Sequence, residues 1–494
     1  MQKLVTIYLD LSGKNRLWAV CALAGAALLA RAAEPAPARH FYVPENTNYT
    51  IVKSVLDSLR FTLDRTLKPD VYGHLVSISS FVDPEGQPMV WHDFGNLEGP
   101  GWAANAVGGA WEIYTMGRFL GQLAWQTNAL LILDHVLDGN FITEKTGFIR
   151  GYRETTAGRS TTGRFCLNYK HNSDWFCPGS MAKVAYQLLV FSDELGQSPR
   201  AGRMRQIAQR CAAWLAKNLQ SVPNGWFPRR ATPDGKVYQK SPEGGDDAFW
   251  QTSADGLFIL QLQAALTAHE LADYRAALKE KTATFMGAGG IFGSINHDTY
   301  DPHESVAYAV AFRTLLAVAD ALNDKSSKSI RAFAYDKCLA GLDQFKMNED
   351  RHGVATKGLL YMEKSWDTAY LWENAEAALA YFEAARDTRK RDRAKSHEYE
   401  LDGLVILRAI AKHHHGPHGF LTEGVDWNNH VSQKHHIDQK EFGDIRYTEP
   451  FLNNQHIAEP TLYYLEHLAS KSSRGGKTQW RDPEGNVLVE LGGR

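Results

Sequence analysis

The sequence repeats one short turn, Gly225-Trp226-Phe227, with close copies at Gly147-Phe148-Ile149, Gly290-Ile291-Phe292 and Gly419-Phe420-Leu421. Gly73-His74-Leu75 and Gly353-Val354 are weaker copies. The copies follow one another at intervals of roughly 60 to 80 residues, which is typical of a repeated structural unit. Glycine suits such a turn because it ends a helix or adopts a positive φ, and the apolar residue after it enters the core.

Each unit has the same order: an amphipathic helical stretch, the glycine turn, a polar loop, and a second, more apolar helical stretch. The first helix is expected at 50–67, where Ile51, Val55, Leu59 and Leu63 have helical spacing. The other helices are expected at 101–120, 124–138, 179–195, 203–220, 252–268, 271–285, 304–322, 327–346, 367–385, 397–412 and 453–469. Small residues in 101–120 allow helices to approach closely, as an inner ring requires.

This pattern predicts an all-α fold, an (α/α)6 toroid of six helical hairpins with long loops and small β-hairpins at one end. The apolar helices would face the centre and the amphipathic helices the outside. Residues 50–470 would form this catalytic domain, and residues 471–494 a C-terminal tail that closes as a β-hairpin. Because loops held on a rigid scaffold tend to carry function, we expect the active site at the loop end.

The N-terminus has the pattern of an export signal over residues 1–33. Lys14 and Arg16 precede an apolar run at 17–30, and small residues follow at 30–33. The run is too short for a membrane span, and the apolar residues after Cys21 argue against lipoprotein cleavage there. We expect residues 34–49 to be a linker and the mature protein to be periplasmic or extracellular, with no membrane contact after cleavage.

Charge and cysteine content narrow the class of protein. The 54 basic and 56 acidic residues leave a net charge of −2, so no global field attracts nucleic acid or membranes. Cys166 and Cys177 flank one loop and could form a disulfide in an oxidising compartment, whereas Cys211 and Cys338 lie in helical patterns as buried thiols. No spacing resembles a zinc site. We therefore expect a monomer or dimer with no metal and no cofactor.

Several predicted loops combine acidic and aromatic residues, which core packing does not explain. They are Trp91-His92-Asp93, Asp174-Trp175, Asp246-Asp247-Ala248-Phe249-Trp250, Trp366-Asp367 and Asp426-Trp427. With these loops and the six helix pairs, residues 45–470 resemble the six-hairpin glycosidase superfamily of (α/α)6 toroids. The resemblance implies an enzyme that acts on carbohydrate. The same architecture also carries polysaccharide lyases and sugar epimerases, so the reaction does not follow from the fold.

A site for sugars needs aromatic platforms and carboxylates, and glycoside hydrolysis needs two carboxyl groups. We expect Asp247 and Asp367 to be catalytic, with Glu304 or Glu373 as the next candidates; burial of Glu373 against Trp372 would favour an acid role. Capping of a helix remains an alternative role for Asp367. The expected substrate-binding residues are Trp91, His92, Asp93, Trp175, Asp246, Trp250, Tyr300, His303, Trp366 and Trp427.

Two other functions remain open. A lyase or an epimerase would use histidine and tyrosine to move a proton, and the candidates are Tyr300, His303, His92, His171 and His430. The histidines at 413–436 match no metal-ligand spacing and are interpreted as structural or solvated. A toroid that binds glycan without chemistry is the remaining alternative, although several candidate carboxylates make it the weaker one.

Overall fold

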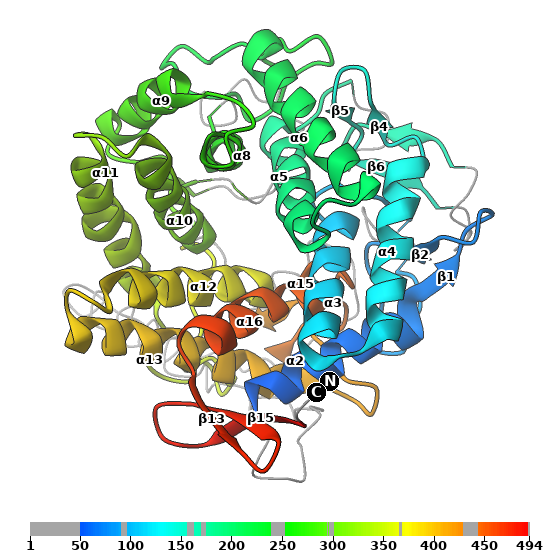
Figure 1. Cartoon of the computed structure of the whole chain (residues 1–494), viewed down its shortest axis with the longest axis vertical. Coiled ribbons are helices and arrows are strands. Elements are labelled where there is room, and N and C mark those ends of the chain that lie inside the picture. The colour runs from blue at the N-terminus through cyan, green and yellow to red at the C-terminus, as the bar shows by residue number, and fades with distance from the viewer. Residues whose placement is uncertain are drawn as a thin grey trace, which may run out of the picture.

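Two concentric rings of helices make up the protein, seen end-on in Figure 1. The computed structural model describes residues 50–89, 96–155, 163–168, 174–238, 252–293, 295, 301–364, 368–427 and 443–492. The inner helices are α3 (Ala106–Leu120), α5 (Pro178–Glu194), α8 (Leu257–Ala268), α10 (Ser305–Leu322), α12 (Leu371–Thr388) and α16 (Ala458–His467). The outer helices are α2 (Ile51–Phe61), α4 (Leu123–Asp138), α6 (Pro199–Asn218), α9 (Arg275–Gly287), α11 (Ser327–Phe333) and α13 (Arg393–Ile410).

Short helical segments extend several of these helices. They are η1 (Thr62–Thr66) after α2, η2 (Ala254–Gly256) before α8, η3 (Ala334–Leu339) and η4 (Ala340–Phe345) after α11, η5 (Ala411–His413) after α13, and α15 (Asn453–His456) before α16. The expected single helix at 453–469 is interrupted at Ile457. Pro460 explains the interruption, because proline has no N–H to bond the carbonyl one turn back.

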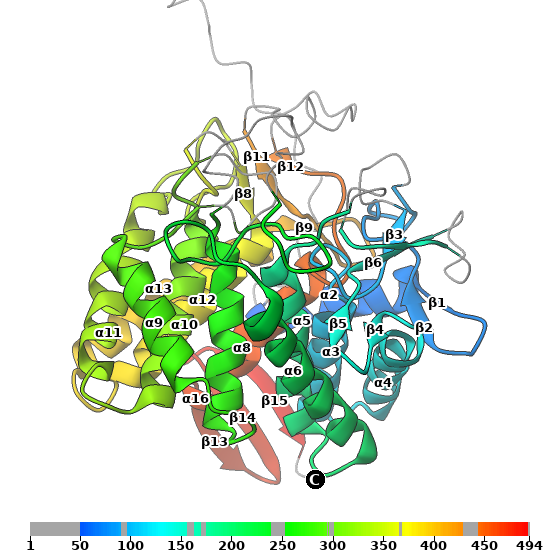
Figure 2. The same cartoon turned by 90° about the horizontal axis from the view of Figure 1, so that it is seen from above.

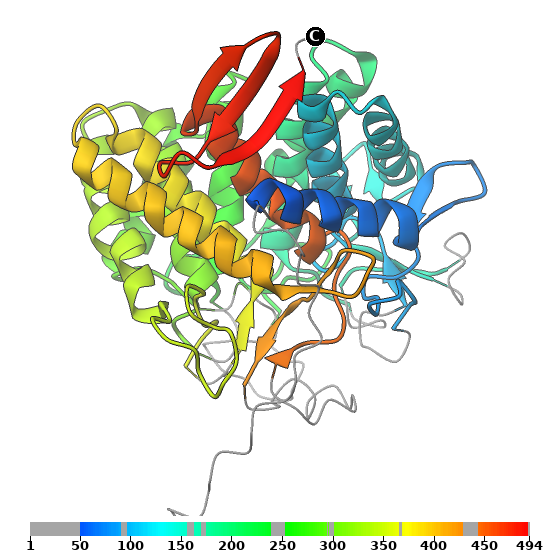
Figure 3. The same cartoon turned by 90° about the horizontal axis from the view of Figure 1, so that it is seen from below.

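The ring closes by pairing the two ends of the chain. Each inner helix contacts the next one around the ring, and α16 contacts both α3 and α2. Figure 3 shows the first helix, α2, beside the last, α16. The hydroxyl of Thr50 also donates to the carbonyl of Leu488 at 3.1 Å, which ties the start of α2 to the tail. The (α/α)6 toroid predicted from the sequence is confirmed.

Burial follows the predicted division between inner and outer helices. Almost every residue of α10 is buried, whereas α9 buries only Leu278, Thr282 and Phe285 along one face. Such a narrow apolar stripe is typical of a helix packed on one side only. Among the described helices, α10 alone is long and apolar enough to suit a membrane span, and most of it is buried in the inner ring.

All six repeated glycines have positive φ, from 74° at Gly147 to 107° at Gly290. Gly147 also lies directly on α6: a Cβ there would approach the main-chain nitrogen of Cys211 to 2.3 Å. Likewise, a Cβ on Gly419 would come within 2.6 Å of the Asp57 carbonyl in α2. At these two positions the turn after one outer helix rests on the next outer helix, so conformation and space both require glycine.

Small antiparallel sheets lie at the loop end of the ring (Figure 2). Three glycine turns connect the hairpins β1 (Leu67–Pro69) with β2 (Leu75–Ser77), β4 (Ile142–Thr143) with β5 (Phe148–Ile149), and β9 (His414–His415) with β10 (Phe420–Leu421). Two three-stranded sheets have the orders β3-β6-β7 and β12-β11-β8. Their strands are β3 (Leu97–Glu98), β6 (Tyr152–Glu154), β7 (Phe165–Cys166), β8 (Thr368–Tyr370), β11 (Gly424–Asp426) and β12 (Gly443–Asp444).

The C-terminal tail forms a three-stranded antiparallel sheet where the sequence predicted one hairpin. Its strands are β13 (Ser470–Arg474), β14 (Lys477–Arg481) and β15 (Val487–Gly492). The predicted hairpin is β14 and β15, and β13 pairs with the other edge of β14. Trp480 packs against Phe119 of α3 with ring centroids 5.2 Å apart. The sheet therefore covers the end of the ring opposite the loops (Figure 2).

Candidate active site

The inner helices all run in the same direction, because the chain enters each from the loop end and leaves through a short turn at the other end (Figure 2). Their first turns and the loops that enter them form the ring mouth. Main-chain N–H groups without helical partners point toward it, which favours negative charge there.

Glu304 and Glu373, two of the predicted catalytic carboxylates, lie together at the ring mouth. Glu304 immediately precedes α10, and Glu373 lies in the first turn of α12. Their residues are 0% and 1% exposed. The Ser305 hydroxyl donates to Glu373 Oε2 at 3.3 Å, and the main-chain N–H of Ile295 donates to Glu304 Oε2 at 2.6 Å. Both carboxylates are therefore oriented by hydrogen bonds from the same segment of chain.

Four aromatic and basic side chains meet on the axis of the ring. Trp102, which precedes α3, contacts Trp372 of α12 at 5.3 Å and Phe258 of α8 at 5.5 Å between ring centroids. The Nζ of Lys183, on α5, lies 4.0 Å from the centroid of Trp102. In Figure 1, α5 and α12 lie on opposite sides of the ring. The Nζ of Lys183 on α5 lies 5.8 Å from the centroid of Trp372 on α12, so these side chains meet at the centre of the ring. We call these four residues the axial cluster.

A buried charge cluster around Arg313 of α10 lies next to the axial cluster. Its Nη1, Nε and Nη2 contact Glu376 at 2.5 Å, Glu383 at 3.0 Å and Glu459 at 3.1 Å. Burial by itself would raise the pKa of Glu376, but attraction to Arg313 and His456 outweighs it and lowers the pKa. The guanidinium therefore holds α10, α12 and α16 together through charge-assisted hydrogen bonds.

His456 connects this charge cluster to α3. Its Nε2 lies 2.8 Å from Glu376 Oε1, and its Nδ1 lies 3.6 Å from Glu112 Oε1, too far for a hydrogen bond. Burial raises the pKa of Glu112 well above its usual range, because the charged form is poorly solvated there. The ring centre thus contains a histidine between one carboxyl group whose pKa is lowered and one whose pKa is raised.

Comparison with known proteins places this geometry in a known fold. No protein-family model matches the sequence, and no curated protein matches it. Similar solved structures include a D-mannose isomerase, at TM-score 0.54 and 11% identity over 85% of this chain and 97% of the other. A cellobiose 2-epimerase from Bacillus thermoamylovorans has TM-score 0.52 and 11% identity, with 84% and 100% covered. A family 76 glycoside hydrolase from a bovine Bacteroides thetaiotaomicron strain has TM-score 0.50 and 9% identity, with 85% and 78% covered.

The chain has an (α/α)6 toroid fold, which it shares with these solved structures. At such low identity the likeness concerns the fold of the toroid and not its reaction. What the toroid does has to be argued from its own residues.

Three other predicted site residues lie in the part of the chain that the structure describes. Trp175 and Trp427 are almost fully buried, and Arg230 lies over the Trp175 ring at 4.7 Å. His303 is exposed, and its Nδ1 lies 2.6 Å from the hydroxyl of Tyr308. Tyr308 packs against Phe345 of the outer segment η4 at 5.6 Å, so His303 lies above the junction of the two rings.

The remaining predicted site residues lie outside the described residues and stay predictions. They are Asp247, Asp367, Trp91, His92, Asp93, Asp246, Trp250, Tyr300 and Trp366, together with the alternative bases His171 and His430.

Sequence reasoning missed Asp255, which lies between the first turns of α8 and α5. A Cβ on Gly179 of α5 would come within 2.5 Å of its carboxyl carbon. Burial raises the pKa of Asp255 to about 7, although Arg229 and Arg230 act in the opposite direction. Among the described residues, neither carboxyl oxygen has a hydrogen-bond partner. The signal was a single acidic residue within the apolar stretch 252–268.

The expected disulfide between Cys166 and Cys177 is not formed. Cys166 lies in β7, where its Sγ contacts the Arg164 carbonyl at 3.7 Å, whereas Cys177 precedes α5 near Asp255. The two thiols thus lie in different surroundings, and burial raises their pKa values to about 11 and about 12. Thiols with raised pKa react slowly. Cys211 and Cys338 are buried thiols, as predicted.

The first histidines of the 413–436 run have structural roles. His413 Nδ1 lies 2.9 Å from Asp444 Oδ1, and His414 Nε2 lies 2.6 Å from the Ser54 hydroxyl of α2. Burial lowers the pKa of His414 to about 4, so it stays neutral. Among the described residues, no group of His, Cys, Asp and Glu is arranged to hold a metal ion.

Proposed function

We propose that this protein is an exported glycoside hydrolase that cleaves oligosaccharides or uronate-containing glycans with paired carboxyl groups. One observation carries the proposal: the buried Glu304 immediately precedes Ser305, whose hydroxyl donates to the buried Glu373 at the start of the neighbouring inner helix. Hydrolysis needs this kind of pair, because one group must give a proton while the other accepts one.

The reaction follows from general acid and base chemistry. The acid donates its proton to the glycosidic oxygen as the bond from that oxygen to the anomeric carbon breaks. A water oxygen bonds to the same carbon while the carboxylate takes a proton from the water. Within the pair, the main-chain N–H of Ile295 that donates to Glu304 favours a carboxylate there, which leaves Glu373 as the acid. Asp247 and Asp367 remain predicted partners on the loops.

The test is an activity screen of the purified mature protein with plant, algal and animal glycans. Reducing ends and the absorbance of unsaturated uronate products are read together. New reducing ends without absorbance support a hydrolase, whereas both signals together indicate a lyase. Glu373→Gln should lower kcat at least ~100-fold, the usual contribution of one acid or base. Glu398→Gln, on the exposed face of α13, is the matched control and should leave kcat unchanged.

Sugar epimerisation or isomerisation is the second candidate, favoured by the pair His456 and Glu376. An imidazole oriented by a carboxylate can remove the proton next to the carbonyl of an open-chain sugar and return it. Two of the similar structures are named as an epimerase and an isomerase. Incubation with cellobiose or mannose in heavy water distinguishes the candidates: deuterium would enter next to the anomeric carbon without new reducing ends, and His456→Gln would abolish this exchange.

A further inference from the structure

We propose that Lys183, Trp102 and Trp372 form the innermost binding position of the ring mouth, and that this position takes an uncharged sugar ring at the end of the substrate. The inference rests on the proposed function and names its substrate class. Neither Lys183 nor Trp102 belongs to the predicted site residues or to the paired carboxylates.

The ammonium group of Lys183 lies among aromatic rings. The residue is 6% exposed, and among the described residues its Nζ has no hydrogen-bond partner. Its neighbours are the rings of Trp102, Phe258 and Trp372, at 4.0, 5.6 and 5.8 Å from the ring centroids. The ring faces attract the cation but accept none of its three N–H bonds. A buried donor of this kind is costly unless a ligand oxygen accepts from it.

Other polar atoms of the ring centre also indicate a ligand that can form hydrogen bonds. Among the described residues, Glu112 Oε2 and His456 Nδ1 also lack hydrogen bonds. Trp372 lies 6.3 Å from His456 between centroids, and Glu112 acts electrostatically on Lys183. Donors and acceptors beside aromatic faces match a sugar ring, whose hydroxyl groups donate and accept and whose C–H face stacks on tryptophan.

The surrounding charges disfavour an anionic ligand. The acidic side chains that act on Lys183 are Glu376, Glu112, Glu459 and Glu449, and Arg313 is a permanent cation of the described ring centre. A uronate carboxylate would add negative charge to a low-dielectric site where carboxyl groups already outnumber cations. A hydroxyl oxygen accepts from the ammonium group without that repulsion.

The ring centre is closed beneath this position. Arg313 and its three carboxylates fill the space between α10, α12 and α16 with buried, mutually bonded side chains. A glycan chain cannot pass through such a cluster, so a substrate enters end-on and its terminal ring reaches Lys183. The enzyme would then act on chain ends.

The test is a binding titration of the full mature protein, followed by calorimetry and by tryptophan fluorescence. The probes are D-glucose, D-mannose and cellobiose, with D-glucuronate and D-galacturonate as the acidic counterparts. We expect the neutral sugars to bind at least tenfold more tightly than the acidic ones. Lys183→Met should weaken neutral binding at least tenfold, and Lys183→Gln, which keeps N–H donors, should weaken it less.

A matched control is available at the opposite end of the ring. Lys471 of β13 also lies over a tryptophan, Trp480, at 5.6 Å, but it is exposed. Lys471→Met should leave sugar binding unchanged. Tighter binding of the acidic sugars, or unchanged neutral binding in both Lys183 variants, would overturn the inference. The wild-type comparison needs no variant, so it decides the charge class even if Lys183→Met does not fold.

The failure of this inference differs from failure of the proposed function. Hydrolysis that depends on Glu373 but occurs only at uronate termini would leave the function standing and refute the neutral-sugar position. Absence of hydrolysis on every glycan would refute the function, while the binding titration would still decide the inference.

Discussion

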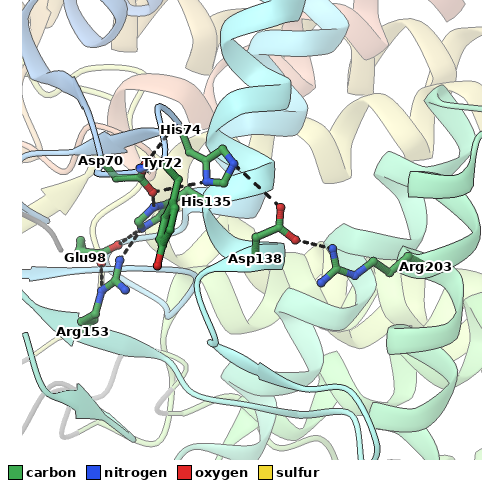
Figure 4. A network of polar contacts seen from close by, with 8 residues as sticks. All are labelled: Asp70, Tyr72, His74, Glu98, His135, Asp138, Arg153 and Arg203. Atoms are coloured by element: carbon green, nitrogen blue, oxygen red, sulfur yellow. Dashed lines mark hydrogen bonds and ion pairs between the residues drawn. The ribbon is translucent and has the colours of Figure 1, made fainter. Parts of the chain in front are cut away.

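The charge cluster at the ring centre and a second one at the rim stabilise the toroid in different ways. At the centre, Arg313 joins three inner helices. At the rim, His135 of α4 lies between Asp70 of the Gly73 turn and Glu98 of β3, at 2.8 and 2.9 Å (Figure 4). Arg153 of β6 donates to Glu98 at 2.7 Å. The first cluster holds three inner helices together, and the second attaches a turn and a small sheet to an outer helix.

The two clusters also differ in how they respond to pH. An arginine stays charged at any ordinary pH. His135 titrates: burial alone would lower its pKa, but hydrogen bonds to Glu98 and Asp70 outweigh burial and raise it. Burial alone would raise the pKa of Asp70, but hydrogen bonds from His135, Tyr72 and His74 outweigh burial and lower it. The cation of the central cluster therefore does not titrate, whereas the histidine of the rim cluster does.

The largest expected effect comes from breaking the central cluster with Arg313→Met. Removing the cation leaves three buried carboxyl groups without it, which costs about 3–5 kcal/mol in the free energy of unfolding. Without the cation, those carboxyl groups would bind protons more tightly in the folded variant than in the unfolded chain. The free energy of unfolding that the substitution costs should therefore grow as pH rises. Urea denaturation at several pH values measures both effects. Arg391→Met, at a side chain 61% exposed, is the control, and a loss below about 1 kcal/mol for Arg313→Met would contradict the prediction.

His135→Gln should have the next largest effect, about 2–3 kcal/mol near pH 6, because it leaves two buried carboxylates without their charged partner. A raised histidine pKa contributes stability that is fully present below the unfolded value of about 6.5 and is lost as pH rises through the folded value. The difference in the free energy of unfolding between wild type and His135→Gln should therefore narrow above pH 6.5. The corresponding difference for Arg313→Met should instead grow as pH rises. A gap that is constant with pH would show that His135 is not charged in the folded protein.

Gly147→Ala and Gly73→Ala test the glycine turns of the rim as a matched pair. Both glycines have positive φ, which costs an alanine about 1 kcal/mol. An alanine Cβ at Gly147 would also collide with the α6 backbone, whereas a Cβ at Gly73 would point into open space. We expect about 2 kcal/mol or more for Gly147→Ala and about 1 kcal/mol for Gly73→Ala. Equal losses in thermal denaturation would mean that the contact with α6 contributes nothing.

The smallest effect is expected at the outer edge of the rim cluster. His74 and Arg203 both lie beside Asp138 in Figure 4, at 3.9 and 2.6 Å, and Arg203 and Asp138 are partly exposed. Surface ion pairs contribute little and are screened by salt, so Arg203→Met should cost less than about 1 kcal/mol and nothing measurable at 1 M salt. A loss as large as that of His135→Gln would mean that the whole network acts as one unit.

Much of the fold follows from short-range patterns. The amphipathic and apolar helices lie within a few residues of their predicted bounds, and the six glycines all have positive φ. Where predicted bounds were wrong, a contact distant in sequence decided them. The expected helix at 367–385 begins at Leu371 because Thr368–Tyr370 pairs with β11 instead. The disulfide prediction used only proximity in sequence, and β7 and α5 take Cys166 and Cys177 to different neighbours.

The candidate site was only partly predictable. Glu304 and Glu373 were expected because each lies at the start of an apolar helix after a polar loop. Glu112, Lys183 and Arg313 were missed because each is an isolated charge inside a helix whose other charged residues lie in its last turn. Such a residue is a recognisable anomaly, since burying a charge is costly without a partner. The partner itself lies on another helix, in a different repeat.

By itself, the sequence determined the number of repeats, the alternation of inner and outer helices, and the end at which the loops gather. Periodicity and glycine act within one or two turns of the chain, so these features are local. Only the tertiary structure decided which charges and aromatic rings share the ring centre. Closing the ring brings α3, α5, α10, α12 and α16 around one axis, and electrostatic and packing energies depend on those distances through space rather than on separation along the chain.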